Sequence, residues 1–263
     1  MQVSTISMME LEKTATAGWR APQQEWLGGW LLRAAEGFTG RANSALAAGD
    51  PGLPLAAAVA AVRAWYEARG LPPMIAVPFA MAGPGDSALD QLLASQGWPL
   101  RQGPAIVMTA RPGAIADQAG PPDADETGLQ AVIAAEPDED WLARYHYRGQ
   151  ELPPIARRLM LSAPWQAFAS VREAGQTIAI GRVAAAGGWA GLTAIETDPE
   201  HRRRGLASRV TARLARAAMT ADAAATGLYL QVEDGNTAAR ALYQGMGFTE
   251  HHRYHYRVAP PPR

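Results

Sequence analysis

Residues 197–210 read TDPEHRRRGLASRV, and this stretch decides the fold prediction because it predicts a strand, a basic turn and a helix in succession. Pro199 cannot donate to a ladder and so ends the strand, and a helix follows from about Gly205. Arg202, Gly205 and Ala207 form the pattern R-x-x-G-x-A. Because Gly205 and Ala207 are small, an anion can approach the amides and the positive dipole end of the helix. The turn is therefore a candidate phosphate site.

A second stretch, residues 228–254, reads LYLQVEDGNTAARALYQGMGFTEHHRY and predicts a strand, a helix and the start of a final strand. It carries a fixed series of side chains: Asn236, Ala239, Leu242, Tyr243, Gly247 and Phe248. Together the two stretches resemble the GNAT superfamily of N-acetyltransferases, whose motifs are Q/R-x-x-G-x-G/A after a strand and N-x-x-A-x-x-L-Y-x-x-x-G-F. The resemblance is clear over residues 177–258, weaker back to Gly128, and architectural in the first half.

The resemblance implies a fold and a co-substrate. The fold is α/β of the α+β type, a mixed, mostly antiparallel central sheet flanked by helices, and the co-substrate is acetyl-CoA, with no metal. The strands at 193–197 and 228–234 would splay apart around the thioester, with the pantetheine arm paired to the first strand and the pyrophosphate on the basic turn. The implied cofactor-binding residues are Ile195, Glu196, Thr197, Arg202, Arg203, Arg204, Gly205, Leu206, Ala207, Ser208, Asn236 and Tyr243.

The implied reaction moves an acetyl group from acetyl-CoA to a primary amine, which attacks the thioester directly. Positioning supplies most of the catalysis, and a backbone N–H at Ile195 to Thr197 would meet the developing oxyanion. Tyr243 would protonate the leaving thiolate, because a phenol with a reference pKa of about 10 stays protonated near pH 7. The alternative is that Leu242 and Tyr243 only pack the helix against the sheet.

The residue that accepts the proton of the incoming amine is left open. One branch of the superfamily, the ribosomal-protein N-terminal acetyltransferases, has a glutamate where this chain has Gln231, and a neutral amide cannot take a proton. The candidates are then Glu196, Glu233 or water, each carboxylate being equally well explained as a surface group. The departure argues against that substrate class.

Three other interpretations compete with that of an enzyme. The chain could be a non-catalytic acyl-CoA-binding sensor or interaction module, or the basic turn could simply begin a helix with a solvated arginine face. Nucleic-acid binding by the clustered arginines is disfavoured, because aromatic residues for base stacking are missing and the formal net charge is only -1. The acceptor is a small-molecule or peptide amine that the sequence does not identify.

The order of predicted elements repeats along the chain. Residues 111–128, RPGAIADQAGPPDADETG, read as a linker without regular periodicity in their first part, and similar strands and helices precede and follow it. We therefore predict two modules, a degenerate GNAT-like scaffold over residues 1–112 and the acetyltransferase domain over residues 127–263. The competing explanation is the recurrence of strands and helices that any α/β protein shows. The first half has AAGDPGLPLA where the second has the basic turn, so only one anion site is expected.

Composition sets the remaining bounds. The chain has no cysteine, which excludes disulfides, thiol nucleophiles and thiolate metal sites. No stretch approaches the roughly 20 apolar residues that span a bilayer, and no basic segment followed by an apolar run opens the chain. We expect a cytoplasmic protein with no membrane partner.

Some polar residues invite a functional explanation. In HHRYHYRV, strand alternation would send His251 and His255 to one side and His252 to the other, which disfavours a zinc site and leaves pocket lining or sheet cover. Around Trp141, Tyr145, His146 and Tyr147, a substrate-facing loop competes with a helix that packs its aromatic residues inward. In the first half the unusual polar residues of one turn, which could face the acceptor pocket, are Arg41, Asn43 and Ser44.

Overall fold

The strands of the molecule join in one eleven-stranded sheet. The computed structural model describes residues 6–81, 87–119, 128–146, 151–220 and 222–261, without the side chains of Gln102 and Ala119. The strands are β1 Gln23–Leu27, β2 Trp30–Ala34, β3 Ala45–Leu46, β4 Met74–Ala80, β5 Leu100–Ala110, β6 Leu129–Ala134, β7 Trp165–Glu173, β8 Gln176–Ala186, β9 Trp189–Thr197, β10 Gly227–Glu233 and β11 Thr249–Val258. Their spatial order is β1-β2-β3-β4-β11-β5-β10-β9-β8-β7-β6.

Neighbouring strands are antiparallel except for two parallel pairs, β3 with β4 and β9 with β10. The expected mixed, mostly antiparallel sheet is thereby confirmed. The helices are α1 Met8–Gly18, α2 Leu55–Glu67, α3 Ala88–Ser95, α4 Pro112–Ala116, α5 Glu139–Arg144, α6 Ile155–Met160, α7 Leu206–Ala217 and α8 Thr237–Gly245, with short 3-10 turns η1 Gly40–Ala42, η2 Asp117–Ala119 and η3 Pro199–His201.

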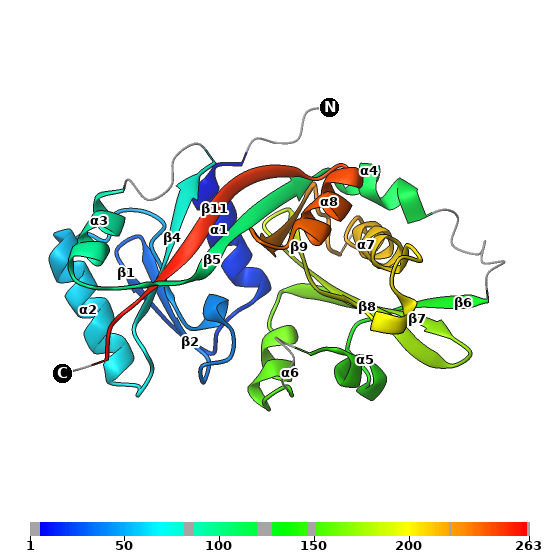
Figure 1. Ribbon diagram of the computed structural model, residues 1–263, viewed down its shortest axis with the longest axis horizontal. Coiled ribbons are helices and arrows are strands. Elements are labelled where there is room, and N and C mark those ends of the chain that lie inside the picture. Colours follow the sequence, from blue (N-terminus) through cyan, green and yellow to red (C-terminus); the bar gives the residue numbers. More distant parts are fainter. Residues whose placement is uncertain (1–5, 82–86, 120–127, 147–150, 221, 262–263) are drawn as a thin grey trace.

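The last strands of the two halves are exchanged. β5 leaves the first half and lies between β11 and β10, whereas β11 returns from the second half to pair with β4. Figure 1 shows β5 and β11 running side by side across the middle of the molecule. The division at 1–112 and 127–263 stays a prediction, and the exchange means that each half contributes a strand to the sheet of the other.

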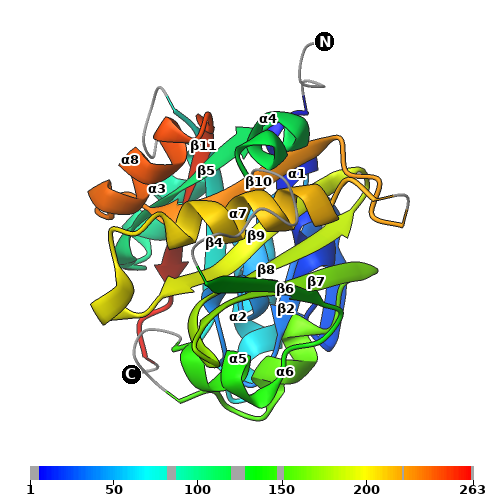
Figure 2. The ribbon, with the colours of Figure 1, turned by 90° about the vertical axis from the view of Figure 1, so that its right-hand side faces the viewer.

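Helices cover both faces of the second half of the sheet. α7 packs on β7, β8 and β9, and its Val210 and Leu214 are fully buried among apolar side chains from these strands. α1 packs on β4, β8 and β9 and buries Leu11 against Tyr229 and Tyr254. Figure 2 shows α7 in front of the sheet and α1 behind it. The second half of the sheet is therefore covered by a different helix on each face.

The segment predicted as a structureless linker begins with a helix. Pro112 occupies the first turn of α4, where its missing N–H costs nothing, and Ile115 is completely buried against the α7 side of the core. Arg216 on α7 donates from Nη2 to the carbonyl of Ala116 at 2.9 Å. The expectation of an irregular first part was wrong, because tertiary packing stabilises a helix too short to show periodicity. Residues 120–127 of the predicted linker lie outside the described part of the chain.

The predicted alternation of the histidines is wrong at one position. β11 and β5 pair Glu250 with Met108 and His252 with Val107, so His251 is an extra residue in a β-bulge. The bulge turns His251 to the side of His252, and their Nδ1 atoms lie 2.7 Å apart. His255 lies elsewhere, with Nε2 2.6 Å from Asp90 Oδ1 on α3.

The helix around Trp141 packs inward, one of the two alternatives that the sequence left open. Trp141 is buried at 1% exposure and donates to the carbonyl of Ala169 at 3.1 Å, and Tyr145 is also buried. Tyr147 lies outside the described residues. In the part of the chain that the structure describes, every helix is too short or too polar to cross a membrane.

Candidate active site

β9 and β10 diverge after a short parallel contact. Their pairing runs from Trp189 with Gly227 to Leu192 with Leu230, after which β9 continues to Thr197 and β10 to Glu233 without a partner in each other. The sequence makes the close contact possible, because any Cβ at Gly191 would collide with the Tyr229 ring across the pair. The resulting gap lies between residues 193–197 of β9 and 231–233 of β10; the resemblance implied a splay over 193–197 and 228–234, but residues 228–230 are paired with β9.

A β-bulge bends β9 at the mouth of this gap. Its register with β8 shifts between Ile180, paired with Glu196, and Arg182, paired with Thr193. Ala194 takes a φ of 53°, a left-handed conformation rare for a residue with a side chain. A bulge redirects backbone groups that a regular ladder would use. The edge of β9 from Ala194 to Thr197 is therefore shaped by the fold to present backbone hydrogen-bonding groups at the gap.

The basic turn ends in an uncapped helix. Gly205 has a φ of 71° and lies at the N-cap position of α7, where no side chain accepts a hydrogen bond from the first turn. The first helical bond runs from Arg209 N to Gly205 O at 3.0 Å, which leaves the amides of Leu206, Ala207 and Ser208 at the open end of the helix. A Cβ built on Gly205 would meet only open space. These observations fit a diphosphate on the helix N-terminus.

The arginines of this turn differ in their surroundings. Arg204 makes a two-pronged contact with Glu173, at 2.6 and 3.0 Å, and this hydrogen bond raises the pKa of Arg204 and lowers that of Glu173. Arg202 and Arg203 are exposed. The charge of Arg204 is thus directed at β7, and Arg202 and Arg203 are better placed to meet an anion from solvent.

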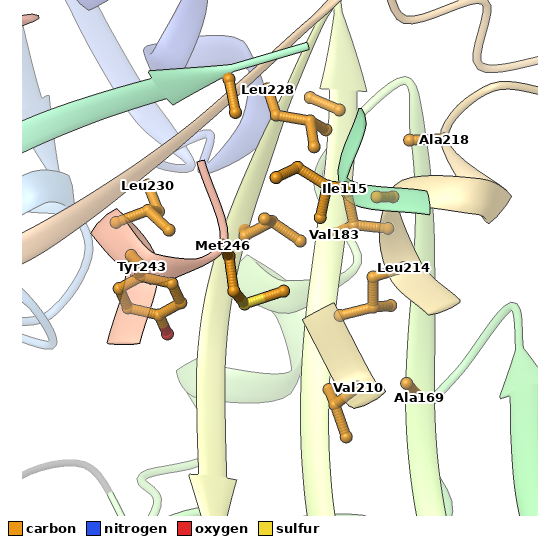
Figure 3. Close-up of a cluster of buried hydrophobic side chains, with 14 of the residues drawn as sticks. Ile115, Ala169, Val183, Val210, Leu214, Ala218, Leu228, Leu230, Tyr243 and Met246 are labelled. Atoms are coloured by element: carbon orange, nitrogen blue, oxygen red, sulfur yellow. The ribbon is translucent and has the colours of Figure 1, made fainter. Parts of the chain in front are cut away.

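Asn236 and Tyr243 both have structural contacts. Asn236 Oδ1 accepts from Ala239 N at 3.0 Å and so caps α8. Tyr243 is buried at 7% exposure, with its ring edge-on to Phe248 at 5.7 Å. Figure 3 shows Tyr243 beside Leu230 and Met246, with its hydroxyl pointing out of the cluster. Burial raises the pKa of Tyr243 to about 12, so the phenol is protonated at neutral pH. Packing is therefore observed, and a proton-donating role remains a prediction.

The two candidate bases lie apart. Glu196 accepts from the backbone N of His146 at 3.0 Å, on the side of the sheet where α5 ends. Glu233 is exposed and lies at the rim of a cavity behind the gap. The structure brings Ile195 to Thr197 close to the basic turn, but it does not bring Glu196 and Glu233 together.

Two connected cavities lie between the halves of the molecule. The larger has a volume of about 240 Å³. The narrower continues from it toward α1, and the two share walls made of Arg41, Thr193, Gln231, Tyr254 and Tyr256. Thr193 and Gln231 belong to β9 and β10, so the cavities open onto the gap. Neither wall includes a residue of the basic turn or α7. The anion site and these cavities are thus separate parts of one site.

Arg41 reaches this wall from the first half of the chain. It lies in a loop that the side chain of Asn43 closes. Asn43 Oδ1 accepts from the amides of Ala35 and Gly37, and Asn43 Nδ2 donates to the carbonyl of Phe38. Arg41 donates from Nη1 to Gln231 Oε1 at 2.9 Å. The polar turn singled out in the sequence therefore supplies one cavity-lining side chain, Arg41, and one structural side chain, Asn43.

A carboxylate from α1 lines the narrower cavity. Glu12 Oε1 lies 2.9 Å from Nε2 of His252, and both side chains are nearly inaccessible to solvent. The His252 ring contacts His251, whose Nε2 lies 3.0 Å from the carbonyl oxygen of Ile6. A chain of polar contacts therefore runs from the cavity toward the partly exposed His251.

Comparison with known proteins identifies the family. A family model described as "Probable histone acetyltransferase Rv0428c C-terminal" matches residues 5–257. The chain belongs to this family. The mycobacterial protein Rv0428c, named as a probable histone acetyltransferase of Mycobacterium tuberculosis, is 31% identical over 98% of this chain and 76% of its own length. The uncharacterized N-acetyltransferase YobR of Bacillus subtilis is 28% identical over 95% of this chain and 97% of its own length.

Solved structures confirm the GNAT fold of this member of the Rv0428c C-terminal family. A GCN5-related N-acetyltransferase from Kribbella flavida superposes with a TM-score of 0.70 at 19% identity, over 98% of each chain. A tandem GNAT protein from the clavulanic acid biosynthesis pathway superposes with a TM-score of 0.68 at 12% identity, over 100% of this chain and 91% of the other. At these identities the likeness establishes the fold, and the names of the relatives support acyl transfer in general.

Sequence reasoning missed Glu12, although a signal was present. Ser7 and Glu10 form a capping box, with Ser7 Oγ accepting from Glu10 N and Glu10 accepting from Ser7 N. This S-x-x-E pattern predicts a helix start and would have placed Glu12 on α1. Arg101 was also missed, since only the irregular pairing of β5 with β11 turns it toward the larger cavity.

Proposed function

We propose that the protein is an acetyl-CoA-dependent N-acetyltransferase that acts on a primary amine. The observation that carries the proposal is the splayed parallel pair β9 and β10, followed directly by the uncapped, glycine-led N-terminus of α7. The edge of β9 would pair with the pantetheine arm, and the amides of Leu206 to Ser208 would hold the diphosphate. The connected cavities at the other side of the gap would receive the amine.

Acetyl-CoA would supply an activated thioester, so the protein needs mainly to position an amine against it. A backbone N–H at the β9 bulge would stabilise the developing oxyanion. Tyr243 would donate its phenolic proton to the leaving thiolate, and its burial supports this role because it keeps the phenol protonated. The hydroxyl would have to be reached through the gap, since Tyr243 lines neither cavity.

A thermal-shift titration tests the cofactor part of the proposal. A ligand at a hundred times its dissociation constant adds about 2.7 kcal/mol to the free energy of unfolding, which moves the melting temperature by roughly 5–10 °C for a chain of this size. Acetyl-CoA and CoA should both produce this shift, and adenosine alone should not. If neither acetyl-CoA nor CoA raises the melting temperature, the proposal is refuted.

Release of free thiol tests the catalytic part. With a panel of primary amines, the enzyme should release CoA in an amine-dependent way, and mass spectrometry should find the N-acetylated product. Tight binding of acetyl-CoA without thiol release on any amine would instead favour the non-catalytic sensor. The thermal shift and the thiol-release assay together therefore separate the two functions.

A further inference from the structure

The connected cavities carry an excess of positive charge. Four guanidinium groups contribute to their walls, and these belong to Arg33, Arg41, Arg101 and Arg182. The walls hold two carboxylates, Glu12, which is bonded to His252, and Glu233 at the rim, so the arginines outnumber them. An anion is therefore the ligand charge that this site favours.

The two buried arginines are satisfied only by neutral oxygens. Arg33 donates to the carbonyl and hydroxyl of Ser44, and Arg182 donates to the carbonyls of Met160 and Gly18. Within the described residues neither makes an ion pair. Burial, helped by the nearby charge of Arg41, lowers the pKa of Arg182 to about 9. Both residues thus place positive charge beside the cavities without a direct ion pair among the described residues.

Arg41 and Arg101 are the two less buried members, and both line the larger cavity. Arg101 Nη1 lies 3.4 Å from the sulfur of Met74, a weak acceptor, and its guanidinium lies 6.0 Å from the centre of the Tyr256 ring. Thr193 Oγ1, in the same wall, is buried without a hydrogen-bond partner among the described residues. Arg101 and Thr193 therefore have hydrogen-bonding groups that a bound ligand could engage.

We propose that the amine acceptor carries a carboxylate, which Arg41 and Arg101 bind in the larger cavity. The proposal rests on the proposed acetyltransferase activity and names its substrate class. A guanidinium matches a carboxylate through two parallel hydrogen bonds. The same positive charge repels polyamines and lysine-rich peptides, and it favours the neutral form of an acceptor amine, which is the nucleophilic form. Amino carboxylates are therefore the expected acceptors.

Matched pairs of amines test this substrate class. The probes are β-alanine, γ-aminobutyrate and L-lysine, each compared with its primary carboxamide, with spermidine as the cationic acceptor. Hydrogen bonds to charged groups contribute about 1.5–3 kcal/mol, so kcat/KM should be roughly 10- to 100-fold higher for a carboxylate than for its amide. Arg101→Gln should remove this preference by lowering kcat/KM for the carboxylates toward the values for their amides. The control Arg63→Gln changes a half-buried arginine of α2 that lies outside both cavity walls, and it should alter neither rate.

Binding of the amino carboxylate, measured without turnover, tests the proposed substrate class independently of the acetyltransferase activity. The preferred amino carboxylate should raise the melting temperature of the wild type and of Arg63→Gln, but not of Arg101→Gln. Stabilisation without acetylation would support the anion site while refuting the proposed activity. Equal rates for carboxylates and amides, or a preference for spermidine, would overturn the proposal.

A second, independent observation concerns the protons of the chain Glu12, His252, His251 and Ile6. The carbonyl of Ile6 only accepts, so His251 donates from Nε2. Three contacts in the chain each need one proton: the contact to Ile6, the contact between the imidazoles and the contact to Glu12. Two neutral imidazoles carry two protons. Hydrogen bonding at all three contacts would place a third proton on the Glu12–His252–His251 unit, which would then be neutral overall.

We infer that Glu12 is the base that accepts the amine proton, and that His252 and His251 pass the excess proton of the chain to solvent. One N–H bond of the attacking amine breaks as an O–H bond to Glu12 forms, and the chain releases one proton at His251. The inference also rests on the proposed function. Burial lowers the pKa of His251, which helps it give up a proton. The other groups that act electrostatically on Glu12 are Arg33, Tyr229, Tyr254 and Tyr256.

The substitution Glu12→Gln tests whether Glu12 acts as a base or only stabilises the structure. A glutamine amide can donate to His252 Nε2, so all three hydrogen bonds are kept without an excess proton. The variant should keep the melting temperature and the affinity for acetyl-CoA, and its kcat should fall about 10²- to 10⁴-fold. Added formate should restore part of the activity of Glu12→Ala.

The control is His255→Gln, which alters a histidine of the same strand that lies outside both cavity walls. Its kcat should stay within a few-fold of the wild type, and formate should not change it. Full activity of Glu12→Gln would overturn the assignment, and so would a loss of activity in Glu12→Ala that formate does not rescue.

Discussion

Tyr243 illustrates how burial sets the chemical state of a single side chain. Its ring packs against Phe248, and desolvation raises the pKa of its phenol to about 12, far above the pH at which an acyl transfer would run. Packing and proton donation are compatible, since the ring can be buried while the hydroxyl faces the gap. The two roles differ only in what the hydroxyl contributes.

Tyr243→Phe removes this hydroxyl and keeps the ring. If Tyr243 is the general acid, kcat should fall about 10²- to 10⁴-fold, while the affinity for acetyl-CoA stays nearly unchanged. Thiol-release kinetics and an acetyl-CoA titration check the two parts. Wild-type turnover in the variant would assign Tyr243 to packing alone.

Asp90 is buried and forms an ion pair with Arg257 that has a structural role. Burial alone would raise its pKa, but hydrogen bonds and charge from Arg257 and His255 outweigh this and hold the pKa below its usual value of 3.8. A lowered pKa in the folded state means that the ionised carboxylate stabilises the protein above the unfolded pKa and ceases to do so as the pH falls through the folded pKa.

Asp90→Asn should therefore destabilise the protein by about 3 kcal/mol at neutral pH, because Arg257 keeps its charge without a partner. The difference from the wild type should shrink as the pH falls below 3.8. Urea denaturation over this range measures it. A difference that is independent of pH would contradict the assignment of the stabilisation to the carboxylate charge.

Among single residues, the sequence predicts best those whose conformation depends on the neighbouring residues in the chain. Gly205 and the following amides could be predicted, because a glycine-led helix start is a local pattern. Glu12 and Arg101 could not be assigned to the site, since they reach it only through contacts between distant parts of the chain. Asn236 was predicted to bind the cofactor, and its observed contact is a helix cap.

At the scale of an element, the backbone conformation at the N-terminus of α7 determines whether its amides are open to a diphosphate. The positive φ of Gly205 directs the chain from η3 into the helix and leaves the first amides open to solvent. The prediction of this turn from sequence succeeded because strand, proline, basic residues and helix are adjacent in the chain.

Gly205→Ala tests the anion site, with Gly175→Ala as its matched control. Both glycines have a positive φ, 71° and 83°, and both face open space, so each substitution should cost about 1 kcal/mol of stability. Only Gly205→Ala places a methyl group where the diphosphate would lie, and we expect its dissociation constant for acetyl-CoA to rise about tenfold or more. Isothermal titration measures this, and equal affinities in the two variants would argue against the site.

Two element-scale predictions failed for one physical reason. The helix α4 and the bulge at His251 are both set by neighbours distant in sequence, α7 in one case and β5 in the other. Periodicity reports which face of an element is apolar, but it does not report where a partner strand has one residue fewer. The helices α7 and α8 and the strands β10 and β11 were predicted from their motifs, whereas the helix α1 and the strand β7 were not predicted.

At the scale of the whole molecule, the exchange of β5 and β11 builds the site from both halves. Arg41 and Arg101 come from the first half, and Gln231 and Tyr254 come from the second. The sequence indicated a repeated order of elements but could not indicate the exchange, because strand order depends on which long-range pairing buries more surface. The predicted division into modules has to be tested with this exchange in mind.

Cutting the chain within residues 120–127 tests this interdependence. Residues 1–119 alone would lack β11 beside β4, and residues 127–263 alone would lack β5 beside β10, which leaves long unpaired edges in both fragments. Each fragment should be unfolded or aggregated on its own, and the two expressed together should form one soluble complex. Size-exclusion chromatography and circular dichroism check this. A folded, monomeric fragment of residues 127–263 would contradict it.

The most direct test of the central claim is amine-dependent release of free thiol from acetyl-CoA, measured for the wild type and for Gly205→Ala across amino carboxylates, their amides and spermidine. We predict thiol release and an N-acetylated product with the wild type, fastest for an amino carboxylate, and a raised KM for acetyl-CoA in the variant. Binding of acetyl-CoA without thiol release on any of these amines would contradict the account.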